Sequence, residues 1–241
     1  LATSPNEVFK AAGMLENHSK EKPIDDYISN FSNILEKYHD KNYSIKFDVI
    51  LSKILKKESK IINQKTNFEL TRKIALTLFR IMRYKDEYEV ARLHTSGDFA
   101  KQFFQENKNA KLEYYLAPPL FSKTDKETGH LQKQKFGSWV FQAFKIISYF
   151  KFLRGTKFDI FGYTTERKKE RALVKKTMNT IEQISEVIEE YNYKKIIEFL
   201  DIPLSIKGYG HIKEKNMNIA EAKWDQALEK LIKRNDLKKV S

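Results

Sequence analysis

The segment YKDEYEVARL, residues 84–93, holds five charged residues and two tyrosines and contains neither glycine nor proline. It predicts a helix in which Lys85, Glu89 and Arg92 share one stripe, so that Glu89 can pair with either neighbour. The two tyrosines and Ala91 form an adjacent, more apolar stripe. Two interpretations follow: a solvated helix face held by ion pairs, or a partly buried polar network on which other segments dock.

The composition of the whole chain indicates a globular, helix-rich protein. Its 241 residues are 41% hydrophobic and 13% aromatic, and its 8 glycines and 5 prolines are few for a turn-rich β fold. Lys and Arg number 45 against 32 Asp and Glu, a net charge of +13. This charge indicates either an acidic partner such as nucleic acid, anionic lipid or a phosphorylated ligand, or a generally basic, soluble surface, which is favoured because the lysines are spread along helices. Because the chain has no cysteine, disulfides, thiolate zinc sites, iron–sulfur clusters and cysteine nucleophiles are excluded within it.

Apolar residues recur at helical spacing along most of the chain, so we expect a mainly α, multi-helix globular domain. Helices near residues 24–38 and 43–55 are joined by a short turn, which predicts an antiparallel helical hairpin. A helix from about residue 67 is expected to continue unbroken through residues 84–93 to a C-cap at Gly97. Further helices are expected at residues 5–16, 98–104, 137–153, 165–190, 193–200 and in a C-terminal segment around Trp224.

Two stretches differ in character from the other helical runs. Residues 111–136 include Ala117-Pro118-Pro119, which cannot continue a helix, and they predict a short β hairpin or an extended excursion. Residues 137–153 are apolar nearly all round, which predicts a central, buried helix. We expect residues 1–22 to be an N-terminal extension or linker with a short helix, and residues 23–241 to be the domain.

The chain has no pattern that predicts a membrane span. Residues 1–22 lack a basic region followed by an apolar run, as a secretory signal would have. The most apolar stretch, residues 139–153, is too short to span a bilayer and carries Lys145 and Lys151. We therefore expect no membrane partner and a cytoplasmic location.

Common active-site motifs are not found in the sequence. The five histidines have no HxxxH or HExxH spacing, and the chain has no GxGxxG, GxxxxGK[ST] or GxSxG. Carboxylates alternate with arginines and suit mutual pairing better than acid–base catalysis. Residues 208–211, Gly-Tyr-Gly-His, predict either a tight turn or a binding loop. The lysines are not interleaved with aromatic residues, so nucleic-acid binding is not favoured.

Five blocks of the sequence together resemble a known domain. They are YKDEYEVARL at 84–93, LAPPL at 116–120, KFG at 135–137, LRGTKFDIFGYTTERKKERAL at 153–173 and IKGYGHIKEKN at 206–216. Over residues 24–234 the chain resembles the C-terminal domain of single-chain indolepyruvate ferredoxin oxidoreductases, a domain labelled as one of unknown function. These enzymes belong to the 2-oxoacid:ferredoxin oxidoreductase family.

The resemblance implies a parent enzyme that oxidises arylpyruvates to acyl-CoA with thiamine diphosphate, Mg²⁺, 4Fe-4S clusters, CoA and ferredoxin. It does not place that chemistry here, because clusters need cysteines and Gly97-Asp98-Phe99 is not the GDG…N motif for thiamine diphosphate. We expect an accessory domain without a catalytic residue, metal or cofactor of its own. Its expected partners are the catalytic domains of the same polypeptide or complex, within a homo-oligomer, with ferredoxin or CoA as further candidates. The alternative is a stand-alone basic helical module that binds nucleic acid or a protein.

The charged, aromatic and glycine-bearing blocks predict one polar network that organises the domain. In this hypothesis three arginines, at 154, 167 and 171, pair with the carboxylates at 86, 87 and 89, while the loop at residues 208–211 packs against the same helix. The candidate network or interface residues are Lys85, Asp86, Glu87, Tyr88, Glu89, Arg92, Arg154, Asp159, Tyr163, Glu166, Arg167, Glu170, Arg171, Tyr209, His211 and Lys213.

Overall fold

The computed structural model describes residues 23–61, 67–95, 105, 113–116, 134–208 and 210–239, and the side chains of residue 211 and residues 233–239 are not among the described parts. The described residues form two compact units. The helical unit combines Ser19–Lys85 with Leu153–Ser241, and the described part of the hairpin unit lies within Asp86–Phe152. As predicted, the chain is mainly α-helical with a short antiparallel pair of strands.

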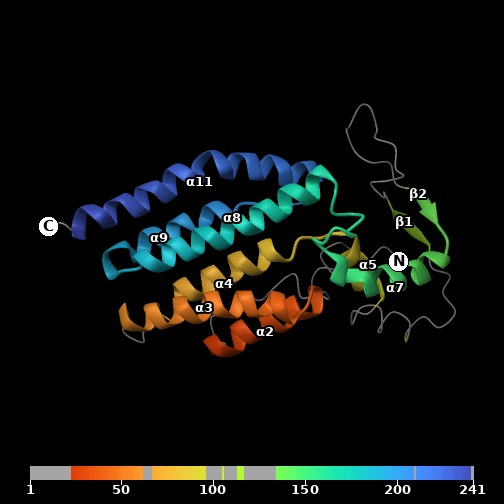
Figure 1. The fold of residues 1–241 in the computed structure, drawn as a ribbon, viewed down its shortest axis with the longest axis horizontal. Helices are drawn as coiled ribbons and strands as arrows, with labels where there is room; N and C mark the ends of the chain where they lie inside the picture. The colour runs from red at the N-terminus through yellow and green to blue at the C-terminus, as the bar shows by residue number, and fades with distance from the viewer. Residues whose placement is uncertain are drawn as a thin grey trace. The chain divides into compact units, whose positions relative to one another are not determined.

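The helical unit begins with the predicted helical hairpin. α2 (Ile24–Tyr38) and α3 (Lys41–Ile61) lie side by side after a short turn (Figure 1). Phe31 and Leu35, one helical turn apart, are buried on the face of α2 that meets the core. The Phe31 ring stacks on Phe79 with ring centroids 4.2 Å apart, which joins the hairpin to the next helix.

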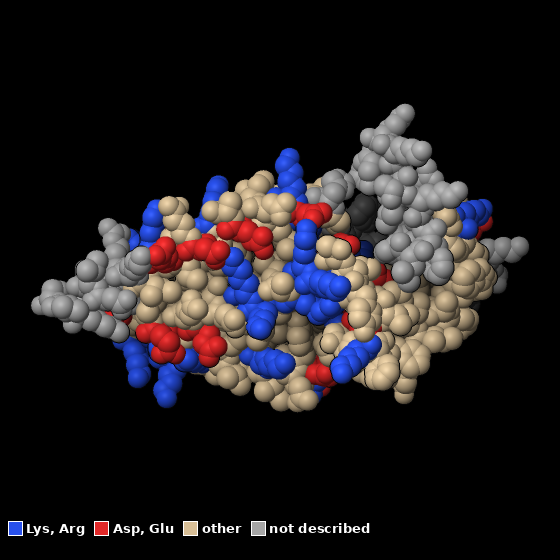
Figure 2. Space-filling model, turned by 45° about the horizontal axis from the view of Figure 1, so that its top comes forward, with Lys and Arg blue, Asp and Glu red and all other residues tan. Residues whose placement is uncertain are grey.

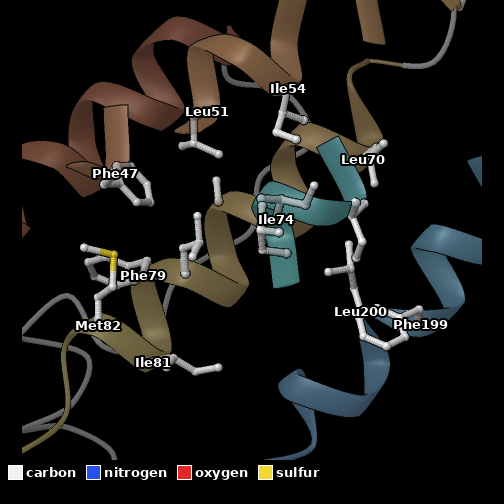
Figure 3. Close-up of a cluster of buried hydrophobic side chains, with 14 of the residues drawn as sticks. Phe47, Leu51, Ile54, Leu70, Ile74, Phe79, Ile81, Met82, Phe199 and Leu200 are labelled. Carbon is white, nitrogen blue, oxygen red and sulfur yellow. The ribbon is translucent and has the colours of Figure 1, made fainter. Parts of the chain in front are cut away.

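The rest of the helical unit packs around α4 (Glu69–Met82). Figure 3 shows the centre of this core, where Leu51 and Ile54 from α3 meet Leu70 and Ile74 from α4. Leu200, which follows α9, belongs to the same cluster. The other elements of this unit are α8 (Thr165–Val187), η3 (Glu190–Asn192), α9 (Tyr193–Phe199), α10 (Asp201–Leu204) and α11 (Gly210–Lys239).

A carboxylate inside this core caps the start of α4. Glu58 of α3 is fully buried and accepts hydrogen bonds from the backbone amides of Leu70, at 3.1 Å, and Thr71, at 2.8 Å. It also accepts from the hydroxyls of Thr71 and of Tyr193, the latter at 2.7 Å. The first amides of a helix have no acceptor within the helix, so Glu58 supplies from a neighbouring helix what an N-cap side chain supplies locally. Burial raises the pKa of the Tyr193 hydroxyl, and the hydrogen bond to Glu58 raises it further.

The hairpin unit contains α5 (Glu87–Thr95), β1 (Tyr114–Leu116), β2 (Gln134–Phe136) and α7 (Trp139–Tyr149), which leads into η2 (Phe150–Leu153). The strands pair antiparallel with Tyr114 opposite Phe136, in the region where the sequence predicts a hairpin. α5 packs closely against α7. The small core between these elements is formed by Ala91, Tyr114, Val140 and Phe144.

The predicted continuous helix through residues 84–93 is wrong, because the chain leaves helical geometry between α4 and α5. Arg83 caps the end of α4, and Asp86 Oδ1 accepts a hydrogen bond from the Glu89 amide at 2.8 Å as a local N-cap for α5. Lys85 therefore precedes the helix and does not share a stripe with Glu89. The freed carbonyl of Tyr84 accepts a hydrogen bond from the Tyr38 hydroxyl at 3.0 Å.

The predicted burial of the helix at residues 137–153 is also wrong. Only Val140 and Phe144 of α7 are buried, whereas Trp139 and Tyr149 expose 63% and 79% of their surface. Apolar composition on all faces shows that a helix can be buried, but it does not supply the neighbours that would cover it.

Some predicted elements lie outside the described residues: the helices at residues 5–16 and 98–104 and the C-cap at Gly97. Among the helices that the structure describes, none combines the length and apolar character needed to cross a bilayer.

Candidate functional site

Two carboxylates of the opening segment, those of Asp86 and Glu89, are buried rather than solvated. Glu89 is fully buried and receives both arms of Arg92, with Nε at 2.7 Å from Oε2 and Nη2 at 2.8 Å from Oε1. This two-bond geometry is the strongest form of the pair that the spacing predicts. Asp86 is buried as the cap of α5, Tyr88 is buried beside it, and Glu87 is half-buried. These positions favour a polar network over a solvated face for this segment.

Arg154 lies in the helical unit against the end of α2. Its Nη1 donates to the carbonyl of Tyr38 at 2.7 Å, and its guanidinium lies over the Tyr38 ring, 3.8 Å from the centroid. A cation at the C-terminus of a helix stabilises the negative end of its dipole. Next to Tyr38, His39 is held by Asp40, with Nδ1 2.9 Å from Oδ2. Burial lowers the pKa of His39, and the charge of Arg154 lowers it further.

Residues 154–164, which we call the aromatic loop, are held by a single buried carboxylate. Asp159 accepts hydrogen bonds from the amides of Gly155, at 2.8 Å, and Gly162, at 2.9 Å. Arg171 of α8 donates to the Gly162 carbonyl at 2.6 Å, and its other terminal nitrogen lies 4.0 Å from Asp159. A Cβ on Gly162 would lie 2.3 Å from Asp159 Oδ2, so this tight approach requires glycine.

Tyr163 closes the loop while its ring remains exposed. Its hydroxyl donates to the carbonyl of Lys157 at 2.7 Å, which joins the two sides of the loop. Thr164 then caps α8 by accepting a hydrogen bond from the Arg167 amide at 3.3 Å. The aromatic loop is thus fixed at both ends, with Phe158 and Ile160 exposed between them.

A second buried carboxylate joins α8 to α11. Glu170 receives Arg167 Nη1 at 2.8 Å and Lys213 Nζ at 2.6 Å, and Lys169 pairs with Glu214 beside them. These residues border a cavity of about 280 Å³ whose lining is Thr165, Glu166, Lys169, Glu170, Gly210, Lys213, Glu214 and Met217. Glu166 is exposed and lies 3.7 Å from Arg167 Nη1. The predicted loop packing at Tyr209 and His211 lies outside the described side chains.

The structure therefore groups the candidate residues into local clusters. One lies on α5, one at Arg154, one around Asp159 and one around Glu170. The predicted pairs between Arg154, Arg167 or Arg171 and the carboxylates at 86, 87 and 89 join the two units, and they stay predictions. Fixed charge-assisted hydrogen bonds of this kind hold helices and loops in place rather than exchange protons.

Sequence reasoning missed the Glu58 cluster. The lysine-rich residues 56–66 predict a polar link, which is wrong for residues 56–61 because α3 continues to Ile61. Phe47, Leu51, Ile54 and Glu58 follow one face of this helix. That spacing was the available signal for a buried glutamate. Within the described residues, no group of three or more His, Asp or Glu side chains is placed to hold a metal ion.

Comparison with family models gives one match, to the Family of unknown function (DUF6537), over residues 24–226. Comparisons with curated proteins and with solved structures gave no match. The family model covers most of the chain, from the first residues of α2 to the middle of α11. The chain belongs to the DUF6537 family of unknown function.

Proposed function

We propose that the chain is an accessory domain of an indolepyruvate (2-oxoacid):ferredoxin oxidoreductase, which oxidises arylpyruvates to acyl-CoA in the cytoplasm. The resemblance of five sequence blocks motivates the proposal, and each of them includes described residues that form buried clusters or secondary structure. The domain would support assembly with the catalytic domains of the same polypeptide or complex, in a homo-oligomeric enzyme.

The observation that supports a docking role is the exposed apolar face of α7 and η2 in the hairpin unit. Trp139, Ile146 and Phe150 follow a spacing of seven and then four residues, so they lie on one side, and all three are exposed. Tyr149 and Phe152 extend this apolar surface. Exposed apolar clusters of this kind mark surfaces that bind other proteins.

We propose that the cofactors of the parent enzyme bind to other domains. An iron–sulfur cluster needs cysteine thiolates, and the chain has none. Thiamine diphosphate is held through Mg²⁺ by oxygen ligands, and the described residues offer no group of carboxylates arranged for a metal ion. We therefore place thiamine diphosphate, Mg²⁺, the 4Fe-4S clusters and CoA chemistry on other domains. The positive charge of the chain suits acidic ferredoxin or the phosphates of CoA as partners.

The test is indolepyruvate-dependent reduction of ferredoxin by the parent enzyme with and without residues 1–241. We expect deletion to reduce the rate or the assembly of the enzyme, and addition of the separate chain to restore it. Replacement of Trp139 and Tyr149 by alanine in the intact enzyme should weaken assembly, whereas Ile45→Ala with Val49→Ala, also exposed apolar positions, should not. Equal activity and assembly with and without residues 1–241 would show that the proposal is wrong.

A further inference from the structure

The aromatic loop displays three large apolar side chains on the helical unit. Phe158, Ile160 and Tyr163 expose 76%, 65% and 60% of their surface, although they lie within ten residues of the buried Arg154. A short loop that exposes so much apolar surface loses the stabilisation that burial would give. This cost requires an explanation beyond the packing of the helical unit itself.

The display is rigid. Asp159 fixes the amides of Gly155 and Gly162, Arg171 holds the Gly162 carbonyl, and the Tyr163 hydroxyl bonds across to residue 157. A fixed loop loses little conformational entropy when it binds, so its exposed side chains can contribute most of their contact energy. The exposure is therefore that of a preorganised surface.

Exposed lysines lie within the aromatic loop and follow it on α8. Lys157 lies in the loop, and Lys168 and Lys175 are exposed on α8, seven residues apart on one helix face with the exposed Ala172 between them. Positive charge near the start of a helix opposes the helix dipole, so the dipole does not account for Lys168 at this position. In Figure 2, Lys and Arg gather in the middle of the visible face, whereas Asp and Glu form clusters toward its left side. Because the helix dipole does not account for Lys168, we infer a role in recognition for this lysine.

We propose that the aromatic loop and the first turns of α8 form a docking site for an acidic protein segment that carries apolar side chains. An apolar centre with aromatic anchors and a charged rim is the usual anatomy of a protein interface. Lysines at the rim attract carboxylates and steer the encounter. The site is independent of the oxidoreductase proposal, because it is defined by the geometry of the helical unit alone.

Other classes of partner fit this surface less well. If a second copy of the chain bound through the same surface, the lysines of the two copies would face and repel one another. Nucleic acid is bound through aromatic stacking, and Ile160 at the centre of the tip has no π face.

The experiment is selection of random displayed peptides on the immobilised 241-residue chain, followed by measurement of Kd for synthetic peptides by fluorescence anisotropy. We expect enriched peptides in which Asp or Glu surround aromatic or aliphatic residues, with binding that weakens as salt rises. Alanine at Phe158, Ile160 and Tyr163 together should weaken binding at least about tenfold. Lys157→Glu with Lys168→Glu should do the same.

Matched controls separate the loop from general surface effects. Ile45→Ala with Val49→Ala removes exposed apolar side chains of α3, and Lys46→Glu with Lys56→Glu reverses exposed charges there. Both control variants should bind as the original chain does, and circular dichroism should show that all variants keep their helices. The proposal is overturned if no acidic and apolar peptide is enriched, or if such peptides bind the loop variants unchanged.

Two further probes decide between classes of ligand. Vesicles of phosphatidylcholine with and without phosphatidylglycerol test a bilayer, and a single-stranded oligonucleotide tests nucleic acid. Binding of either probe that is lost in the triple loop variant would assign the loop to that ligand and overturn the proposal. Failure of the peptide selection would leave ferredoxin reduction by the parent enzyme unchanged, so the two proposals fail separately.

Discussion

Two buried glutamates of the helical unit are held in different ways. Glu58 lies in the core and accepts from two amides and two hydroxyls, all of them neutral donors. Glu170 lies beside a cavity between α8 and α11 and is held by two cations, Arg167 and Lys213. The difference shows that burial alone does not assign a role to a carboxylate. The donors do so: amides indicate a cap that fixes backbone, and cations indicate a joint between side chains of two helices.

The largest effect is expected at Glu58. Glu58→Ala should lower the free energy of unfolding by about 3–4 kcal/mol, because several buried donors lose their acceptor at once. Urea denaturation followed by circular dichroism measures this, with Glu182→Ala, an exposed glutamate of α8, as the matched control. If both variants unfold at the same urea concentration, the cap contributes nothing and the comparison fails.

A smaller effect is expected at Glu170. Glu170→Ala should cost about 2–3 kcal/mol, because Arg167 and Lys213 keep their charge beside the gap. Since the Lys213 end borders a cavity, the loss should shrink as salt rises, whereas that of Glu58→Ala should not. Glu214→Ala removes the exposed pair with Lys169 and should leave stability unchanged. A salt response that is the same for Glu58→Ala and Glu170→Ala would contradict the distinction.

Asp159 tests whether a loop carboxylate behaves like Glu58, since it also holds backbone amides. Gly162→Ala places a methyl group against Asp159 and should lower the free energy of unfolding by about 1–2 kcal/mol. Gly137→Ala is the control, because its new Cβ would meet its nearest neighbour at an ordinary 3.6 Å. Thermal unfolding of the two variants gives the comparison. Equal melting temperatures would mean that the loop yields and is not held by Asp159.

The smallest expected effect is pH dependence at His39. Its pKa is lowered in the folded state by burial and by Arg154, so the unfolded chain takes up a proton near the ordinary value of 6.5 and the folded chain only at lower pH. Stability should therefore fall as pH decreases below about 6.5. Urea denaturation at pH 7.5 and 5.5 should show a smaller fall for His39→Asn than for the original chain. An identical fall in both would exclude His39 as a contributor.

How far the sequence predicts the molecule depends on the range of the interactions involved. The helical hairpin and the Glu89–Arg92 pair follow from spacing within one helix, and periodicity shows them directly. The break before Glu87 does not follow from this spacing. The same polar residues are compatible with a continuous helix and with a new helix that Asp86 caps, and the structure has the second arrangement. Apolar periodicity also could not show that Trp139 lacks a cover, since burial depends on a neighbour distant in the sequence.

The same limit applies to the candidate site. The charged blocks predict that Arg167, Glu170 and Lys213 matter, and the structure brings these three together. Glu58 escaped prediction because the groups that donate to it lie 12 to 135 residues away along the chain. The only signal of its burial in the sequence is that Glu58 lies one helical turn after Ile54, on the same apolar face.

Tyr38 has a consequence for how this architecture can change. Its hydroxyl binds the carbonyl of Tyr84, where the chain leaves the helical unit, and its own carbonyl and ring bind Arg154, where the chain returns. Tyr38 thus holds Tyr84 and Arg154 close together, at the points where the chain leaves and re-enters the helical unit. Such a point tolerates exchange of the intervening segment, because the ends of any replacement are already positioned. We therefore expect that the segment between the two units' junctions can be replaced by one of different length, in evolution or by engineering, without changes to the core of the helical unit.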